Sequence, residues 1–186
     1  PQVLGLLYLE CLGCYDDWRF ISHNIRDPAY ILSTSLLLAI NNAAHGSARA
    51  LVRLGAAANS ASPERNALFH ATKKYDLIVS ALIAATSAKA KQKMERKLEA
   101  TLRIIDLLLR HGADANVTQS YTEITPLAVA CTTYHSAFSS RIVKMLLDHG
   151  AAINPACERT PLRQAIEQTT TNQDAVEFCR ELISLG

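Results

Sequence analysis

The phrase LLRHGADAN at residues 108–116 returns as LLDHGAAIN at residues 146–154. A third copy, LVRLGAAAN, fills residues 51–59, and a shortened copy, LISLG, ends at Gly186. The paired aliphatic residues are typical of the buried stripe in the last turns of a helix. The glycine can adopt the left-handed backbone that ends a helix without a Cβ clash, and the asparagine is expected to start a tight turn. These copies predict a tandem repeat built from helices.

A second phrase lies between the glycines and predicts where helices start. Threonine or asparagine can cap free backbone N–H groups, and proline is tolerated at the first helical position because its missing donor has no partner there. The leucine then begins the apolar stripe, and a small alanine closes the phrase, which lets neighbouring helices approach. The four copies are TSLLLA from Thr34, NALFHA from Asn66, TPLAVA from Thr125 and TPLRQA from Thr160.

Together, the two phrases resemble the ankyrin repeat family, whose units of about 33 residues contain T-P-L-H-x-A, a helix pair and a closing L-L-x-x-G-A-D-x-N. The resemblance covers nearly everything after residue 24 and is most specific at residues 108–127 and 146–162. It implies an all-α ankyrin-repeat solenoid of stacked helix pairs with short finger-like turns. The family's histidine after T-P-L is absent, so its hydrogen bond to the threonine cannot form; the residues in its place are Leu37, Phe69, Ala128 and Arg163.

The glycine spacing predicts one domain over residues 1–186 with one enlarged repeat. Gly112 and Gly150 are 38 residues apart, whereas Gly55 and Gly112 are 57 apart. Subtracting the family period leaves roughly 24 extra residues. We expect a degenerate first unit at residues 1–28 and repeats at 29–59, 60–116, 117–154 and 155–186. Pro1 in place of methionine, and an end on a repeat glycine, suggest a fragment of a longer chain.

The extra residues fall between Ala71 and Leu108, a stretch without glycine or proline. Apolar residues there form two stripes at steps of three and four, divided by a polar break at Thr86 and Ser87. We therefore expect both helices of the second repeat to be longer by about 12 residues and to form a protruding antiparallel hairpin. The alternative is an ordinary repeat with a disordered loop.

The ankyrin resemblance implies a non-catalytic protein-interaction module, a scaffold or adaptor that presents finger turns and first-helix faces. Tyr121 is the leading candidate anchor because an aromatic in an exposed turn offers rigid area with a polar tip. Tyr134, His135 and Phe138, in the enlarged turn of the third repeat, suggest either an interface or packing against the hairpin. The charged candidates that would surround an anchor are Arg65, Glu123, Glu158, Arg159 and Arg163. The alternative for the turn residues is simple solvation.

Charge is unevenly distributed in a chain whose formal net charge is only +2. Residues 73–110 hold nine basic and four acidic side chains. Three interpretations remain open for the densest basic cluster: a solvated helix face, a contact to an acidic protein and a contact to nucleic acid. No aromatic residue interrupts this cluster, which disfavours nucleic acid. Its members are Lys89, Lys91, Lys93, Arg96 and Lys97.

The five cysteines, an odd and scattered number, favour a reducing compartment such as the cytoplasm or nucleus. Cys11 and Cys14 have the spacing of half a zinc site, but no second half follows. Cys131 and His135 are four residues apart, but no orienting carboxylate or oxyanion-hole motif accompanies them.

The sequence contains no glycine-rich phosphate loop and no apolar run long enough to cross a membrane. We therefore expect no catalytic activity, cofactor, metal, membrane contact or small-molecule substrate, and a protein as the partner. A regulatory or targeting segment of a larger enzyme is the alternative to an adaptor.

Overall fold

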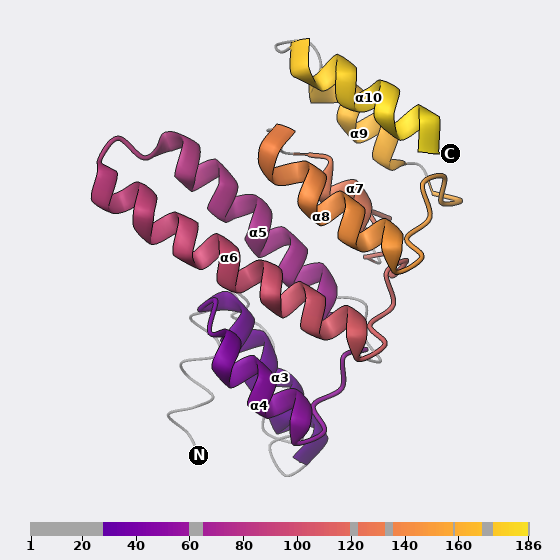
Figure 1. The fold of residues 1–186 in the computed structure, drawn as a ribbon. Helices are drawn as coiled ribbons and strands as arrows, with labels where there is room; N and C mark the ends of the chain where they lie inside the picture. Colours follow the sequence, from indigo (N-terminus) through magenta and orange to yellow (C-terminus); the bar gives the residue numbers. More distant parts are fainter. Residues whose placement is uncertain are drawn as a thin grey trace, which may run out of the picture.

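The computed structural model describes residues 28–59, 65–119, 123–132, 136–157, 159–168 and 173–185, and the regular secondary structure within them is helical. The helices form antiparallel pairs that lie side by side (Figure 1). The pairs are α3 (Pro28–Asn41) with α4 (His45–Arg53), α5 (Ala67–Ala84) with α6 (Ala88–Arg110), α7 (Pro126–Ala130) with α8 (Ser136–Asp148), and α9 (Pro161–Gln168) with α10 (Gln173–Leu185). The degenerate unit expected before α3 lies outside the described residues.

Packing joins each helix to its partner and to the equivalent helix of the next pair. The first helices stack in the order α3, α5, α7 and α9, and the second helices in the order α4, α6, α8 and α10. One hydrophobic cluster continues through all four pairs, from Leu36 to Leu182. The chain is therefore an all-α solenoid, in which each layer is stabilised mainly by its neighbours.

The repeat glycines end the second helices as the sequence predicts. Gly55, Gly112 and Gly150 have φ values of 95°, 78° and 82°. After α6, the N–H of Ala113 donates to the carbonyl of Leu108 at 3.0 Å, and the corresponding bond after α8 joins Ala151 to Leu146. This pairing satisfies carbonyls that the end of the helix would otherwise leave free.

Three of the four predicted helix starts are confirmed by side-chain caps. The Asn66 side chain accepts a hydrogen bond from the N–H of Phe69 at 3.1 Å. The Thr125 hydroxyl accepts one from Ala128 at 3.2 Å, and Thr160 caps α9 in the same way.

The prediction that Thr34 starts a helix is wrong. Helix α3 begins at Pro28, and the Thr34 hydroxyl lies inside it, where it donates to the carbonyls of Tyr30 and Ile31 at 2.9 Å. Proline is favoured at the first helical position, and the apolar stretch around Ile31 and Leu32 extends the helix toward its N-terminus. Helix α3 therefore starts six residues before Thr34, about 1.7 turns earlier than the sequence phrase indicates.

The second pair contains the helical insertion that the glycine spacing predicts. Helices α5 and α6 have 18 and 23 residues, against 14 and 9 in the first pair. The two helices are separated at residues 85–87, where the Ser87 hydroxyl caps α6 by accepting from the N–H of Ala90 at 3.2 Å. The disordered-loop alternative is wrong, and so is the expectation of equal lengthening, because most of the extra length relative to the first pair lies in α6.

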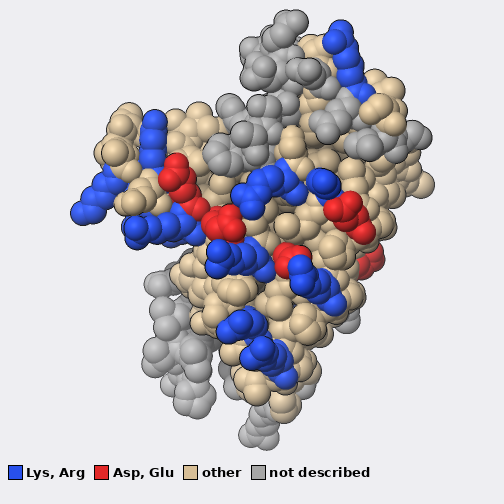
Figure 2. Space-filling view, in the orientation of Figure 1, with Lys and Arg blue, Asp and Glu red and all other residues tan. Residues whose placement is uncertain are grey.

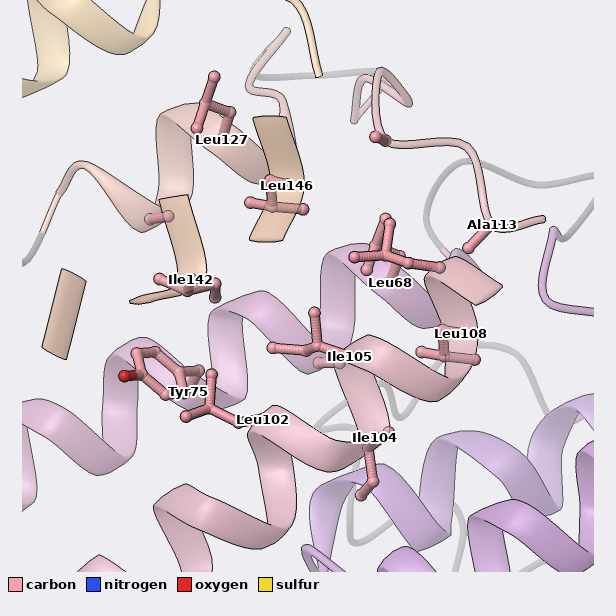
Figure 3. Packing of buried hydrophobic residues seen from close by; sticks show 14 of the residues in the cluster. Leu68, Tyr75, Leu102, Ile104, Ile105, Leu108, Ala113, Leu127, Ile142 and Leu146 are labelled. Atoms are coloured by element: carbon pink, nitrogen blue, oxygen red, sulfur yellow. The ribbon is translucent and has the colours of Figure 1, made fainter. Parts of the chain in front are cut away.

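Buried side chains hold the hairpin together and join it to the stack. Ile78 and Leu82 of α5 and Leu98 of α6 are buried between the two helices at the outer part of the hairpin. Farther along α6, Ile104 points toward the helices of the first pair, whereas Ile105 lies between α6 and α5 (Figure 3). The base of the hairpin is therefore covered on several sides, and its tip extends past both neighbouring pairs (Figure 1).

Candidate interaction surface

The charged residues predicted in the finger turns, which come directly before the first helices, lie along one edge of the stack. Arg65, Glu123 and Arg159 each come one or two residues before the capping residue of a first helix, α5, α7 and α9 respectively. Because these helices pack side by side, their N-terminal ends are adjacent. The structure therefore brings together three charges that are far apart in the sequence.

The charges on this edge have different surroundings. The Arg65 guanidinium lies 4.7 Å from the centre of the Tyr30 ring and donates to the Tyr30 hydroxyl at 3.1 Å. Arg65 is therefore packed against Tyr30 of the preceding pair. Arg163, on the exposed side of α9, forms an ion pair with Glu167 at 3.2 Å. Such an exposed pair contributes little to stability.

Glu123 is exposed and adopts a left-handed backbone with φ of 51°, which is uncommon for a residue other than glycine. Its N–H donates to the carbonyl of Gln119 at 2.9 Å, and the N–H of Gln119 donates to the carbonyl of Ile124 at 3.3 Å. These two bonds close the finger and fix the backbone from which the Glu123 carboxylate extends.

Five predicted contact residues are not located by the structure. Tyr121, Tyr134, His135 and Glu158 lie outside the described residues, and Phe138 belongs to α8 but its side chain is not described. Their roles stay predictions.

Two asparagines bridge consecutive repeats, a feature that the sequence reasoning missed. The Asn59 amide donates to the carbonyl of Gly112 at 2.7 Å, and its oxygen accepts from the N–H of Asp114 at 2.7 Å. Asn116 makes the same two bonds in the next layer, with the carbonyl of Gly150 and the N–H of Ala152, at 2.9 and 2.6 Å. The fixed spacing of asparagine after each glycine is the signal that indicates this role. The bridges join the end of one repeat to the end of the next.

The basic cluster predicted from the sequence lies at the tip of the hairpin. Lys89, Lys91, Lys93 and Arg96 are exposed, and Lys97 is half-buried. Figure 2 shows their positive side chains gathered at the projecting end of the molecule. Among the described residues, no ion pair neutralises any member of this cluster.

Two acidic residues of α6, Glu99 and Asp106, instead pair with arginines nearer the base. Glu99 contacts Arg103 at 3.5 Å and Arg141 of α8 at 3.3 Å, and Asp106 contacts Arg110 at 2.9 Å. The pair with Arg141 joins the second and third layers. The charge of the tip is left without compensation as a result.

A depression of about 440 Å³ lies where the start of α4 meets α6. His45, Glu95, Arg96, Glu99, Ala100 and Arg103 line it. Small-molecule sites are usually lined by large aliphatic and aromatic side chains, whereas charged side chains supply most of this lining. It resembles an ordinary charged surface at a junction between layers.

Burial inside the helical stack is the main cause of the shifted pKa values. Burial raises the pKa of the Cys131 thiol, and the neighbouring Cys179 adds to the effect. Burial also raises the pKa of Tyr75 to about 12, with Arg141 opposing and Glu99 reinforcing the shift. The Cys131 thiol is therefore kept protonated inside the stack, which argues against a nucleophilic role.

Burial raises the pKa of Asp76, while a hydrogen bond from the Thr132 hydroxyl at 3.3 Å and the charge of Lys73 oppose the shift. This bond joins α5 to the turn after α7.

In the described ranges, no group of three histidine, cysteine or acidic side chains is placed to hold a metal ion. No helix of these ranges is long and apolar enough to cross a membrane.

Stacked helix pairs, left-handed glycines at the helix ends and aligned fingers define a helical repeat solenoid. A family model of three ankyrin repeats matches residues 95–186, from the middle of α6 to the last glycine. The chain therefore belongs to the ankyrin repeat family, and it is a protein-interaction module in general character. Helices α3 to α5 precede the match and continue the same stacking. No curated protein matches the chain in sequence.

Proposed function

We propose that this chain is a non-catalytic adaptor or scaffold that binds another protein with its finger turns and the exposed faces of its first helices. The observation that supports this most directly is the common edge formed by Arg65, Glu123 and Arg159. Capped first helices define the position of that edge, and the Asn59 and Asn116 bridges keep successive layers in register. The burial of Cys131 supports the absence of catalysis.

The mechanism is the presentation of side chains from a backbone that is ordered before binding. This surface then loses less conformational entropy when a partner docks than a mobile surface would. Glu123 and Arg159, exposed and of opposite charge, would select a partner with the complementary pattern. Tyr121 would supply the apolar anchor. The free cysteines Cys131, Cys157 and Cys179 are consistent with an intracellular, reducing location, which we include in the proposal.

The proposal is tested by capture of partners from native cell extract with the intact chain and with a triple finger variant, Glu123→Ala, Arg159→Ala and Arg163→Ala. We expect the main captured protein to bind the variant about tenfold more weakly, because the substitutions remove exposed charge at the interface. The control is Arg49→Ala with Arg53→Ala, which removes two exposed charges from α4, away from the fingers.

Circular dichroism of both variants checks that the fold is retained. Equal capture by the intact chain and the finger variant would contradict the proposed surface. Loss of capture on deletion of residues 80–98 alone would move the binding site to the hairpin.

A further inference from the structure

Large apolar side chains are exposed on the outer half of α5. Leu77 is 56% exposed and Ile83 is 49% exposed, and Ala81 and Ala84 beside them are also exposed. Leu77, Ala81 and Ala84 follow one another at steps of four and three, so they share one face of the helix. A single exposed leucine is ordinary, but a run on one face of a projecting helix marks a contact surface.

The described parts of the neighbouring pairs leave this face uncovered because they are shorter than the hairpin. Helix α7 has only five residues, and the turn after it contacts α5 at Asp76 through Thr132. Beyond that point, the end of α5 and the start of α6 extend past both adjacent layers (Figure 1), whereas Glu95 and Arg96 lie beside His45 of α4. We call residues 77–97 the hairpin tip.

The hairpin tip carries basic charge next to its apolar face. Lys89, Lys91, Lys93 and Arg96 are exposed on α6, and Glu95 is the one acidic residue between positions 77 and 97. The two helices run antiparallel and are joined at residues 85–87, so the exposed faces of α5 and α6 belong to the same narrow projection. A ligand on the apolar strip would lie within reach of several positive side chains.

We propose that the hairpin tip binds an acidic amphipathic helix from a partner protein. The partner's apolar face would cover Leu77, Ala81 and Ala84, and its glutamates or aspartates would pair with the lysines of α6. This mode of recognition matches an apolar stripe at helical spacing with charge complementarity at its borders. The inference rests on the proposed function, namely that the chain binds protein, and it adds a second surface and the chemistry of its ligand.

The composition of the tip favours a protein helix over nucleic acid or a lipid surface. Residues 76–97 contain no aromatic side chain on which a base could stack. Ala81 and Ala84 bury little area, which is a poor anchor in a bilayer, but small residues let a second helix approach closely. Leu77 then provides the larger contact on this face, and Ile83 lies about 120° away around the helix.

The hairpin tip is ordered without the partner. Ile78 and Leu82 within the tip and Leu98 directly after it are buried, and Ser87 caps the start of α6. An ordered surface reduces the entropy lost on binding, so a modest apolar strip is sufficient when charge adds to it.

The test selects ligands directly on the protein. A display library of short peptides is panned on the intact 186-residue chain, and the enriched peptides are synthesised with a fluorescent label for anisotropy titrations. We expect acidic peptides with leucine or similar residues at helical spacing. Their affinity should fall about tenfold for Leu77→Ser with Ile83→Ser, and about tenfold for Lys89→Gln, Lys91→Gln and Lys93→Gln.

Matched controls separate this inference from the proposed function. Arg49→Gln with Arg53→Gln removes two exposed charges from α4 and should leave the affinity unchanged, as should the finger variant. Peptides that lose affinity only for the finger variant would overturn the hairpin site and support the finger surface. Enriched peptides that are not acidic, or a failure to enrich any peptide, would also overturn it.

The same variants distinguish a protein ligand from nucleic acid and from a lipid surface. Duplex DNA, single-stranded RNA and vesicles containing phosphatidylserine are titrated in parallel. The contrary result is that one of these ligands binds the native chain and the Leu77 and Ile83 variant but not the lysine variant. That result, with no acidic peptide selected, would overturn the proposed protein ligand.

Discussion

The base and the tip of the α5–α6 hairpin are built from the same two helices but are held in place by different contacts. At the base, Asn59 from the preceding repeat bonds to the carbonyl of Gly112 and to the N–H of Asp114, more than 50 positions away in the chain. At the tip, Ser87 bonds to Ala90, three positions away. The base therefore belongs to the stack, and the tip depends on itself.

This difference separates two tasks within one repeat. Contacts from several layers stabilise the base, so it can keep the fingers in register. The tip has a narrower core and exposed apolar and basic side chains, so it is free to contact a partner. Regions of lower local stability are where binding surfaces usually occur.

The largest expected effect comes from a cavity at the base of the hairpin, which is compared with a cavity near its tip. Ile105→Ala, at a fully buried base position, should lower the free energy of unfolding by about 2–5 kcal/mol. Leu82→Ala, near the tip, should cost about 2 kcal/mol or less because fewer elements surround it. Urea denaturation followed by circular dichroism measures both. Equal losses would show that the tip is as firmly integrated as the base.

The next effect concerns the glycine that ends α6. Gly112 has φ of 78° with open space around its Cβ position, so Gly112→Ala should cost about 1–2 kcal/mol through backbone strain alone. The control is Gly46→Ala near the start of helical α4, which also meets no steric obstacle and should stabilise by about 0.5 kcal/mol. Thermal unfolding of the two variants should shift in opposite directions. A shift in the same direction would contradict the conformational explanation.

A smaller effect is expected from the bridge between layers. Asn59→Ala removes two hydrogen bonds that are exposed to solvent, so the free energy of unfolding should fall by about 1 kcal/mol. Asn59→Asp is the informative partner variant, since it keeps the acceptor for Asp114 and loses the donor to Gly112. Denaturation should give Asn59→Asp a lower free energy of unfolding than the native chain. If both variants retained full stability, the bridges would not hold the layers together.

The smallest global effect is expected at the tip. Ser87→Ala removes the cap of α6 and should reduce the local opening free energy of its first turn by about 1 kcal/mol, with little change in global unfolding. Amide hydrogen exchange resolves this, because residues 88–91 should exchange faster while residues 101–109 stay protected. Rapid exchange throughout residues 80–98 of the unmodified chain would instead contradict an ordered hairpin.

Local chemistry explains why many boundaries could be predicted from the sequence. A glycine with positive φ and a capping asparagine or threonine act within one helical turn, so Gly112, Asn66 and Thr125 reveal their roles without knowledge of the rest of the fold. The predicted helix start at Thr34 is wrong because threonine also occurs inside helices, where its hydroxyl donates to a preceding carbonyl. Propensity and pattern do not separate these two uses.

The candidate surfaces were predictable only in part. The basic cluster at Lys89, Lys91 and Lys93 was visible as a charge run, and its helical context followed from the absence of glycine and proline. The exposure of Leu77 was not visible, since it continues the same apolar pattern as buried residues. Whether an apolar residue is covered depends on how far the neighbouring layers reach.

The sequence by itself determined the repeat family, the helix-ending glycines and the presence of a long helical pair, because these follow from backbone conformation and periodicity over short distances. Only the tertiary structure decided that Asn59 and Asn116 join separate layers, that Arg65 rests on Tyr30, and that one face of α5 is left uncovered. Those features depend on the relative lengths and positions of elements that are distant in the chain, and no local pattern encodes them.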